Sequence, residues 1–508
     1  MELDFNCTDL TLGIIGTGLM GRGIAQIAAM AGVRVLLYDA RSQAAEEARA
    51  AIQAVLDRLV EKGKIGEAEA HRAAENIEVL DALAEVAPCH IVLEAIVENL
   101  EVKRQLFQAL EEIVGCDCLL ATNTSSLSIT AIAAGCHNPG RVGGFHFFSP
   151  VPLMKVVEVI DGVLTEAWVG EVLMGLAHRM GHTPVRAKDT PGFIVNHAGR
   201  GFGTEALRLL GEGVAEYHKI DQILREAAGF RMGPFELLDL TGLDVSHPVI
   251  ESIYHQYYQE PRFRPSPLTG QRLAAGLLGR KSGRGFYTYR DQRAEPLPLI
   301  PVPSVRPARV WVSRANSQTY AQVAELVTAL GGNLDENEKP QDDALCVVAP
   351  LGRDATTAAL AEDLDPRRTL AIDALFDLGK HRTLMTNPST SQEMRDAAHG
   401  LFSNDGVTVT LIRDSAGFVA QRVVALIVNI SCDIAQQRIA TPQDIDRAVT
   451  LGLGYPHGPL AWGDALGPEK ILTILNEMST FYGDPRYRPS PWLTRRARLG
   501  ISLLTTED

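Results

Sequence analysis

The sequence lacks several features that would point to a membrane, a secretory route or a nucleic-acid partner. Its apolar runs, such as Val423 to Val428, are far shorter than the roughly 20 residues that a membrane-spanning helix needs. No N-terminal stretch joins positive charge to an apolar run, so we expect no signal peptide. Lys and Arg number 48 against 62 Asp and Glu, and a net charge of −14 disfavours nucleic-acid binding, which usually needs a basic face. We therefore expect a cytoplasmic protein that binds neither membranes nor nucleic acid.

The sequence also lacks a cysteine framework. Its seven cysteines are odd in number and scattered. Cys116 and Cys118 form a C-x-C without a second pair at zinc-site spacing, so we predict no metal site. Scattered cysteines of this kind are typical of reduced thiols in a cytosolic protein.

What is present describes a soluble globular chain of several domains. At 508 residues the chain is too long for one ordinary core and suggests two to four domains. Hydrophobic residues make up 46% and charged residues 22%, as in soluble proteins.

The first third of the chain alternates short β-branched runs with helical patterns. Such alternation predicts a doubly wound, parallel α/β sheet. The helical pattern from Ala44 to Glu75 is the long one, and from about Asp189 long helices punctuated by Gly and Pro follow. The expected strands are Leu12 to Ile15, Val33 to Tyr38, Ile91 to Ala95, Leu119 to Thr122, Val142 to Phe147 and Val156 to Val159.

An internal repeat relates the helical segment to the C-terminal part of the chain. Three groups of residues recur in order at nearly one offset, 225 for the first two, and this predicts a duplicated helical domain. The matches are Asp189–Phe193 with Asp414–Phe418, Gly233–Pro234 and Asp239 with Gly458–Pro459 and Asp464, and Pro261–Pro267 with Pro485–Pro491.

These patterns predict an α/β plus all-α chain of five segments. Residues 291–307 are rich in proline and read as a linker. Residues 308–413 hold strand-like runs (Val310 to Val312, Leu345 to Ala349, Leu370 to Ile372) but no glycine fingerprint, so we interpret them as a degenerate α/β domain. The expected domains are α/β at 1–188, helical at 189–290, degenerate α/β at 308–413 and a second helical copy at 414–508.

A glycine fingerprint predicts that the first domain is a Rossmann domain that binds NAD. A G-x-G-x-x-G follows one expected strand, opens a helix and precedes the next strand, a context that makes the motif specific. Its glycines permit the tight turn, the approach of backbone to pyrophosphate and close helix packing. Asp39 ends the second strand, where a carboxylate binds a ribose 2′-hydroxyl and repels a 2′-phosphate. The predicted cofactor loop is Gly16, Thr17, Gly18, Leu19, Met20 and Gly21.

A histidine and a glutamate twelve residues apart suggest acid–base chemistry. His146 and Glu158 lie on two expected strands that flank a Pro-containing turn. Oxidation of an alcohol needs a base for the hydroxyl proton while a hydride leaves, and histidine titrates near working pH. A carboxylate on the far ring nitrogen would fix the tautomer and stabilise the imidazolium. A lone His on an apolar strand is more often structural, so its context must decide.

That context resembles the 3-hydroxyacyl-CoA dehydrogenase family. Asn123–Leu127, the His146…Glu158 segment and Asp189–Asn196 look like family signatures in family order, and the resemblance covers residues 10 to 290 and most of 400 to 500. It implies NAD-dependent oxidation of an (S)-3-hydroxyacyl-CoA, with His146 as the base and Glu158 as its partner. It also implies that Ser125 and Asn196 bind the substrate oxygen.

The resemblance implies further contacts. Ser149 stands where the family usually has Asn, which puts the nicotinamide contact there in doubt. Lys62 corresponds to a lysine near the CoA phosphates, although solvated helix charges are the commoner explanation. The implied cofactor contacts beyond the glycine loop and Asp39 are Glu98, Lys103, Asn123, Ser149 and Lys281.

The second copy departs from the family pattern. Gln421 occupies the position of Asn196, and no His…Glu segment is found around 380 to 400, so we expect this unit to be catalytically silent. Because helical domains of two-domain relatives form dimer contacts, the second copy is expected to replace a partner subunit as an internal pseudo-dimer. A homo-oligomer of the whole chain also remains open.

The resemblance implies 3-hydroxyadipyl-CoA, an intermediate of phenylacetate catabolism, as the substrate. The alternative is 3-hydroxybutyryl-CoA of short-chain fatty acid metabolism. We expect Arg200, four residues after Asn196 on one helix, to pair with the terminal carboxylate, although an Arg that is solvated or bridged to Glu205 is at least as common an outcome. Because the Rossmann pattern begins at residue 10, no β-oxidation multienzyme is expected. A 3-hydroxyisobutyrate-type enzyme would use a lysine base, against which the His146/Glu158 pair argues. A crystallin-like role would not need Ser125, His146, Glu158 and Asn196 together.

Overall fold

The structure is a computed structural model that describes residues 7, 9–297 and 301–507. Parts of three predicted segments lie outside it, namely residues 1–6 and 8 of the first domain, 298–300 of the linker and 508 of the last domain. The chain divides into two compact units, each described below by itself. The first comprises residues up to His197 together with Ile434–Gly454, and the second comprises Ala198–Asp433 and Tyr455–Glu507.

The first unit is built on an eight-stranded sheet of order β3-β2-β1-β4-β5-β6-β7-β8. Strands β1, β4 and β5 are buried along their whole length, as expected when helices cover both faces of a parallel sheet. The strands are β1 (Thr11–Ile15), β2 (Arg34–Tyr38), β3 (Ile77–Val79), β4 (Ile91–Glu94), β5 (Leu119–Thr122), β6 (Val142–Phe147), β7 (Val156–Asp161) and β8 (Thr183–Lys188).

The expectation of a wholly parallel sheet was wrong at one place. Strand β7 runs antiparallel to β6, whereas every other neighbouring pair is parallel. The physical reason is the short connection, residues 148–155, which contains no crossover helix and can therefore only return the chain antiparallel. This hairpin places residues of β6 and β7 directly opposite each other.

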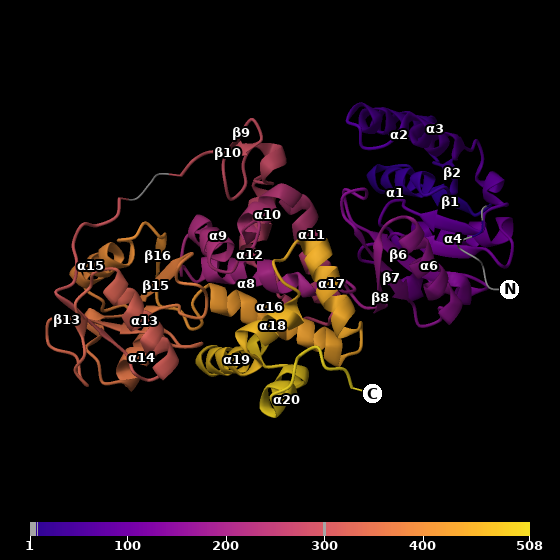
Figure 1. Cartoon of the computed structure of the whole chain (residues 1–508). Coiled ribbons are helices and arrows are strands. Elements are labelled where there is room, and N and C mark those ends of the chain that lie inside the picture. The colour runs from indigo at the N-terminus through magenta and orange to yellow at the C-terminus, as the bar shows by residue number, and fades with distance from the viewer. Residues whose placement is uncertain (1–6, 8, 298–300, 508) are drawn as a thin grey trace. The chain divides into compact units, whose positions relative to one another are not determined.

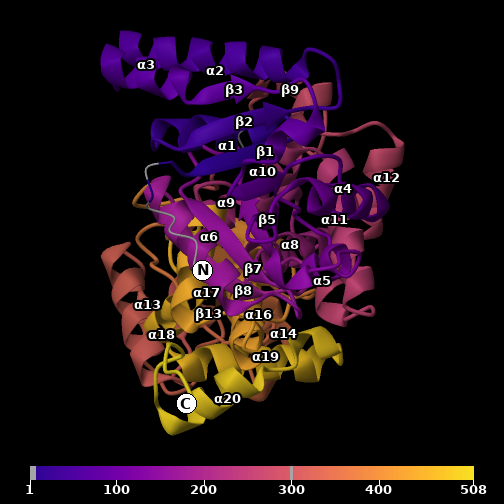
Figure 2. The same cartoon turned by 90° about the vertical axis from the view of Figure 1, so that its right-hand side faces the viewer.

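The helices of the first unit follow the sequence pattern with one correction. The long pattern from Ala44 to Glu75 is two helices, because the chain turns at residues 62–66, where Gly63 has a φ of 63°. Figure 2 shows both helices at the β3 edge of the sheet. The helices are α1 (Leu19–Met30), α2 (Ala44–Glu61), α3 (Glu67–Glu75), α4 (Leu100–Ile113), α5 (Ile129–Ala133), α6 (Ala167–Arg179) and α7 (Val195–Ala198), with 3-10 turns η1 (Leu83–Val86) and η2 (Pro139–Arg141).

The second unit begins with a helical segment. It ends in a two-stranded hairpin that takes in the start of the predicted linker, while residues 301–307 form no helix or strand. Its elements are α8 (Arg200–Gly211), α9 (Tyr217–Glu226), α10 (Pro234–Thr241), α11 (Leu243–Gln256), η3 (Pro261–Phe263), α12 (Pro267–Ala274), η4 (Arg280–Ser282), β9 (Tyr289–Arg290) and β10 (Arg293–Ala294).

A smaller α/β layer follows, with a six-stranded sheet of order β12-β11-β13-β14-β15-β16. Strand β15 is antiparallel to β14, as β7 is to β6. The elements are β11 (Arg309–Val312), α13 (Ser317–Ala329), β12 (Leu334–Asp335), β13 (Ala344–Val348), α14 (Ala355–Ala361), η5 (Pro366–Arg368), β14 (Thr369–Ile372), β15 (Arg382–Thr386), α15 (Gln392–Phe402) and β16 (Val409–Ile412).

The second helical segment completes the chain (Figure 1). It comprises α16 (Ala420–Gln436), α17 (Pro442–Leu453), α18 (Pro459–Leu466), α19 (Pro468–Tyr482), η6 (Pro485–Tyr487) and α20 (Pro491–Leu499). The predicted fold class, a Rossmann domain, a helical domain, a reduced α/β segment and a second helical copy, is confirmed. Within the described residues, no helix is both long enough and apolar enough to cross a membrane.

Candidate active site

The glycine loop between β1 and α1 has the shape that a dinucleotide requires. Gly16 has a φ of 94°, and a Cβ there would lie 2.7 Å from the carbonyl oxygen of Ala95. A Cβ at Gly21 would collide with the carbonyl oxygen of Gly16, so the helix can approach the turn only with glycine there. At Gly18, in contrast, a Cβ would meet no atom within 4 Å. That open side is where a pyrophosphate can approach the backbone at the start of α1.

Asp39 follows β2 and faces this loop. Its Oδ2 accepts hydrogen bonds from Thr17 N (2.8 Å) and Thr17 Oγ1 (2.9 Å), and its Oδ1 accepts one from Arg41 N (2.9 Å). Burial would raise the pKa of the Asp39 carboxyl, but these hydrogen bonds outweigh it and hold the pKa below its usual range. The ionised carboxylate suits a ribose hydroxyl and disfavours a 2′-phosphate.

The β6–β7 hairpin pairs the predicted base with its partner. His146 lies opposite Glu158 in the strand register, and His146 Nδ1 is 2.6 Å from Glu158 Oε2. The other carboxylate oxygen, Oε1, accepts hydrogen bonds from Ile194 N (2.9 Å) and Val195 N (2.8 Å). Glu158 is fully buried, and each of its carboxylate oxygens has a hydrogen-bond partner. With Nδ1 engaged, Nε2 is the ring nitrogen that can exchange a proton.

Ser125 and Asn196, the predicted substrate-oxygen contacts, lie in the same unit and meet. Asn196 Nδ2 lies 3.5 Å from the carbonyl oxygen of Ser125. The Ser125 side chain reaches Glu98, with Oγ 3.3 Å from Glu98 Oε1, while Ser125 N donates to the same oxygen at 2.9 Å. Thr124 Oγ1 also donates to Glu98 Oε1 at 2.7 Å.

Glu98 is thus the centre of a hydrogen-bonded turn. Burial would raise the pKa of the Glu98 carboxyl, but the hydrogen bonds from Thr124 and Ser125 and the nearby Lys103 ammonium hold that pKa below its usual range. Lys103 Nζ lies 2.5 Å from Glu94 Oε1 and 3.4 Å from Glu98 Oε2, and its side chain is only 1% exposed. The expected contact between Lys103 and the cofactor stays a prediction, because the structure shows the ammonium held between these two carboxylates.

Sequence reasoning missed the inner part of this turn. Glu94 is buried, and its Oε2 accepts from Thr122 Oγ1 at 2.7 Å. The motif that contains Glu94 and Glu98 was recognised, but no local signal shows that Glu94 points inward while Glu98 caps the turn.

The remaining expected contacts are placed in four different settings. Asn123 Oδ1 accepts a hydrogen bond from Phe147 N at 2.9 Å and so joins the ends of β5 and β6. Ser149 and Lys62 are exposed, at the hairpin loop and just after α2. Lys281 belongs to the second unit, where Nζ pairs with Asp244 Oδ1 at 2.5 Å. The ligand contacts proposed for these residues remain predictions.

The prediction that one helix carries Asn196 and Arg200 was wrong. Helix α7 ends at Ala198 and α8 begins at Arg200, with Gly199 between them. The prediction from one continuous helix therefore fails, and Asn196 belongs to the first unit whereas Arg200 belongs to the second. Burial lowers the pKa of the Arg200 guanidinium to about 10, so it stays a cation at neutral pH. Glu205, its suggested alternative partner, pairs with other arginines.

The reduced α/β layer holds counterparts of the predicted catalytic positions. Strand β14 follows η5 as β6 follows η2, which sets Asp373 at the position of His146. Asp373 N donates to the carbonyl oxygen of Thr383, so Thr383 takes the position of Glu158. Gln421 Nε2 donates to Asp373 Oδ1 (2.9 Å) and to the carbonyl oxygen of Pro350 (3.3 Å), as Asn196 contacts that of Ser125.

Comparison with known proteins gives one consistent family. The model of the 3-hydroxyacyl-CoA dehydrogenase NAD-binding domain matches residues 11–190, and that of the C-terminal domain matches residues 192–289 and 417–502. The chain is 40% identical over 490 residues to the 3-hydroxyadipyl-CoA dehydrogenase of Escherichia coli K12, covering 96% of this chain and 98% of the relative.

Two further matches agree. The crystal structure of a 3-hydroxybutyryl-CoA dehydrogenase from Escherichia coli K12 has a TM-score of 0.85 and 38% identity, over 97% of this chain and 98% of that one. A probable 3-hydroxybutyryl-CoA dehydrogenase of Bacillus subtilis is 41% identical over 279 residues, 55% of this chain and 97% of the relative. The chain belongs to the NAD-dependent 3-hydroxyacyl-CoA dehydrogenase family.

Proposed function

We propose that this enzyme oxidises 3-hydroxyadipyl-CoA to the 3-oxo thioester, with His146 as the base. The observation that supports the chemistry is the buried His146–Glu158 pair, with an Nδ1 to Oε2 distance of 2.6 Å. The support for the substrate is the likeness to the relative named for 3-hydroxyadipyl-CoA, which extends over 98% of that relative. The place in phenylacetate catabolism rests on the same resemblance.

In this proposal the residues divide the work. NAD, held at the glycine loop, supplies the hydride acceptor. His146 Nε2 takes the hydroxyl proton as the hydride leaves C3, and Glu158 stabilises the imidazolium that forms. Asn196 Nδ2 donates a hydrogen bond to the substrate oxygen, and the Ser125 hydroxyl does the same when its proton turns from Glu98 Oε1 to the substrate. Glu98 keeps Ser125 in place through the hydrogen bond from Ser125 N.

The alternative substrate is 3-hydroxybutyryl-CoA. It is favoured by the likeness, over nearly the whole chain, to the crystal structure of the Escherichia coli 3-hydroxybutyryl-CoA dehydrogenase. Measurement of kcat/KM with 3-hydroxyadipyl-, 3-hydroxybutyryl- and 3-hydroxyhexadecanoyl-CoA separates the two. We expect the dicarboxylic substrate to be preferred by at least tenfold, about 1.4 kcal/mol of transition-state stabilisation. A larger kcat/KM for the butyryl compound would overturn the substrate proposal and leave the reaction class intact.

We also propose that the enzyme works in the cytoplasm as an internal pseudo-dimer. No disulfide joins any of the seven cysteines, which is consistent with a reducing compartment. The C-terminal-domain model matches the chain at two places, so the second match can stand where a partner subunit's helical domain would. A mass of one chain, measured by light scattering, would support the single-chain pseudo-dimer. A mass of two chains would show that the whole chain also forms a homodimer.

A further inference from the structure

One helix of the second helical copy belongs to the NAD-binding unit. Residues Ile434–Gly454 form one compact unit with the residues up to His197, although more than two hundred residues separate them in the chain. Lys188 N, at the end of β8, donates a hydrogen bond to the carbonyl oxygen of Ile439 at 2.8 Å. Helix α17 then packs against β7 and β8 (Figures 1 and 2).

Gly452, near the end of α17, brings the helix backbone against Val195. A Cβ at position 452 would lie 3.0 and 3.2 Å from the two γ-carbons of Val195 and 3.4 Å from Val156 Cγ1. Val195 is 1% exposed and Val156 is fully buried, so neither has free space into which to move. A glycine inside a helix costs about 1 kcal/mol relative to alanine, and a close backbone approach is a reason for one to be there.

Val195 is also one of the two residues whose main chain holds the catalytic glutamate. Its N–H donates to Glu158 Oε1 at 2.8 Å, and Glu158 Oε2 holds His146 Nδ1 at 2.6 Å. Packing of α17 on the Val195 side chain therefore holds the Val195 N–H in place, and this N–H in turn positions the Glu158 carboxylate. A displacement of about 1 Å behind a catalytic group can cost about 100-fold in rate.

We propose that α17 is a positioning element of the active site, acting through Gly452 and Val195 on the Glu158–His146 pair. The second helical copy is then required for the chemistry of the first unit, in addition to any role as a substitute subunit. The proposal rests on the proposed function of His146 and Glu158. Its alternative is that α17 only covers the exposed edge of β8.

The test is Gly452→Val, which adds the atoms that Val195 leaves no room for. We expect kcat to fall at least tenfold while KM for NAD stays within twofold, because the cofactor loop follows β1 and not β7. Val195→Ala removes the two opposing γ-carbons and leaves the main-chain donor, so the double variant should recover most of kcat. Gly203→Val is the matched control, since a Cβ in that helix would meet nothing within 4 Å.

The outcomes are separable. An unchanged kcat in Gly452→Val, or a loss that Val195→Ala does not rescue, overturns the positioning role. A drop in thermal midpoint with unchanged kcat means that α17 is only a cover. If Gly452→Val does not fold, the smaller Gly452→Ala, alone and with Val195→Ala, carries the same comparison. If His146→Ala retains full kcat, the proposed function fails instead.

Discussion

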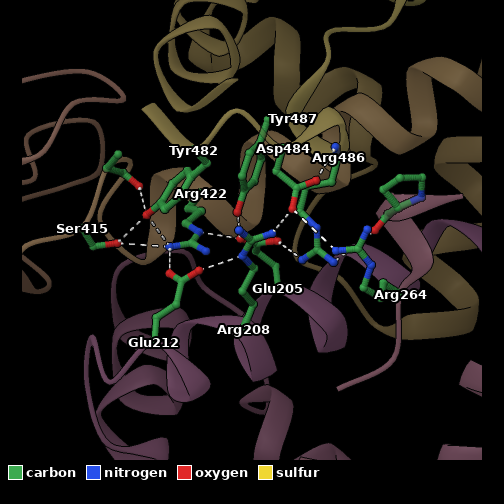
Figure 3. A network of polar contacts seen from close by, with 12 residues as sticks. Glu205, Arg208, Glu212, Arg264, Ser415, Arg422, Tyr482, Asp484, Arg486 and Tyr487 are labelled. Carbon is green, nitrogen blue, oxygen red and sulfur yellow. Dashed lines mark hydrogen bonds and ion pairs between the residues drawn. The ribbon is translucent and has the colours of Figure 1, made fainter. Parts of the chain in front are cut away.

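Replacement of Glu205, on α8, should lower the free energy of unfolding of the second unit more than most other single substitutions do. Its carboxylate is completely buried and joins the first helical copy to the second (Figure 3). Arg422 Nε lies 2.5 Å from Oε1 and Arg486 Nη1 lies 3.0 Å from Oε2, while Tyr487 OH donates to Oε1 at 2.6 Å. The substitution Glu205→Gln keeps the size of the side chain but leaves the buried Arg486 guanidinium facing an uncharged amide and leaves Arg422 with Glu212 as its remaining carboxylate partner.

The size of the effect follows from these burials. Removal of one partner from a buried ion pair typically costs about 3–5 kcal/mol, because the charge left behind is uncompensated. At about 2–4 °C per kcal/mol for a large domain, the thermal midpoint of the second unit should fall by roughly 6 °C or more. The matched control is Glu212→Gln, whose side chain is 30% exposed although it also pairs with Arg422. The control substitution should lower the free energy of unfolding by about 1 kcal/mol or less.

The ion pairs of Glu205 with Arg422 and Arg486 also predict that the stability of the protein depends on pH. Burial would raise the pKa of the Glu205 carboxyl, but Arg422 and Arg486 outweigh it and hold the folded-state pKa below the unfolded value. Glu205 therefore contributes stability at pH values above the unfolded pKa, and this contribution is lost as the pH falls through the folded one. The difference in unfolding free energy between wild type and Glu205→Gln, measured with denaturant, should shrink on acidification. Equal losses in Glu205→Gln and Glu212→Gln, or a difference that does not change with pH, would refute the reasoning.

Two further predictions concern the site. His146→Ala or Glu158→Gln should lower kcat by about 10²–10⁴ while the Kd for NAD measured by calorimetry stays nearly unchanged, and full activity in either variant would remove its assigned role. Asp39→Ala should raise kcat/KM for NADP relative to NAD without unfolding the protein, whereas a wild type that uses both equally would contradict the role of Asp39.

The parts of the fold that the sequence predicted are those encoded by local patterns. The turn at Gly16–Gly21 needs glycines at fixed spacing, so the motif and its strand–helix context identify it without further information. His146 and Glu158 were predicted as partners because they lie on two strands that flank a short turn and because the segment resembles the family signature. The antiparallel direction of β7 follows from that same short connection, but the sequence pattern predicted a parallel sheet and this consequence was overlooked.

The parts that could not be predicted depend on contacts between distant segments. Whether Lys103 reaches solvent or turns inward to Glu94 is decided by the packing of α4 on the sheet, to which the local sequence gives no signal. The break at Gly199 is equally hidden, because a single glycine is tolerated in many helices. Nothing in residues 434–454 indicates that they cover the edge of β8, since an amphipathic helix fits many apolar surfaces.

The internal repeat separates the residues that build the scaffold from those proposed to perform the chemistry. Asp189 accepts hydrogen bonds from Ser128 Oγ and Thr130 N, both at 2.7 Å, and its counterpart Asp414 accepts from Ala355 N at 2.7 Å, so the same role at the start of α5 and α14 keeps the same residue. The positions of His146 and Glu158 are filled in the second layer by Asp373 and by Thr383, a residue that has no carboxylate.

Asp373 also differs from a base that is ready to act. Burial raises the pKa of its carboxyl to about 6, and Oδ1 accepts hydrogen bonds from Gln421 Nε2 at 2.9 Å and Leu375 N at 3.1 Å. The longer side chain of Gln421 accepts as well, from Gly352 N at 2.9 Å, and so ties the loop after β13 to the loop after β14. The positions proposed to contact substrate in the first unit thus correspond to residues that cross-link two loops in the second. This change of role explains why the two copies share the residues at Asp414 and Phe418 but differ at Gln421, where the first copy has Asn196.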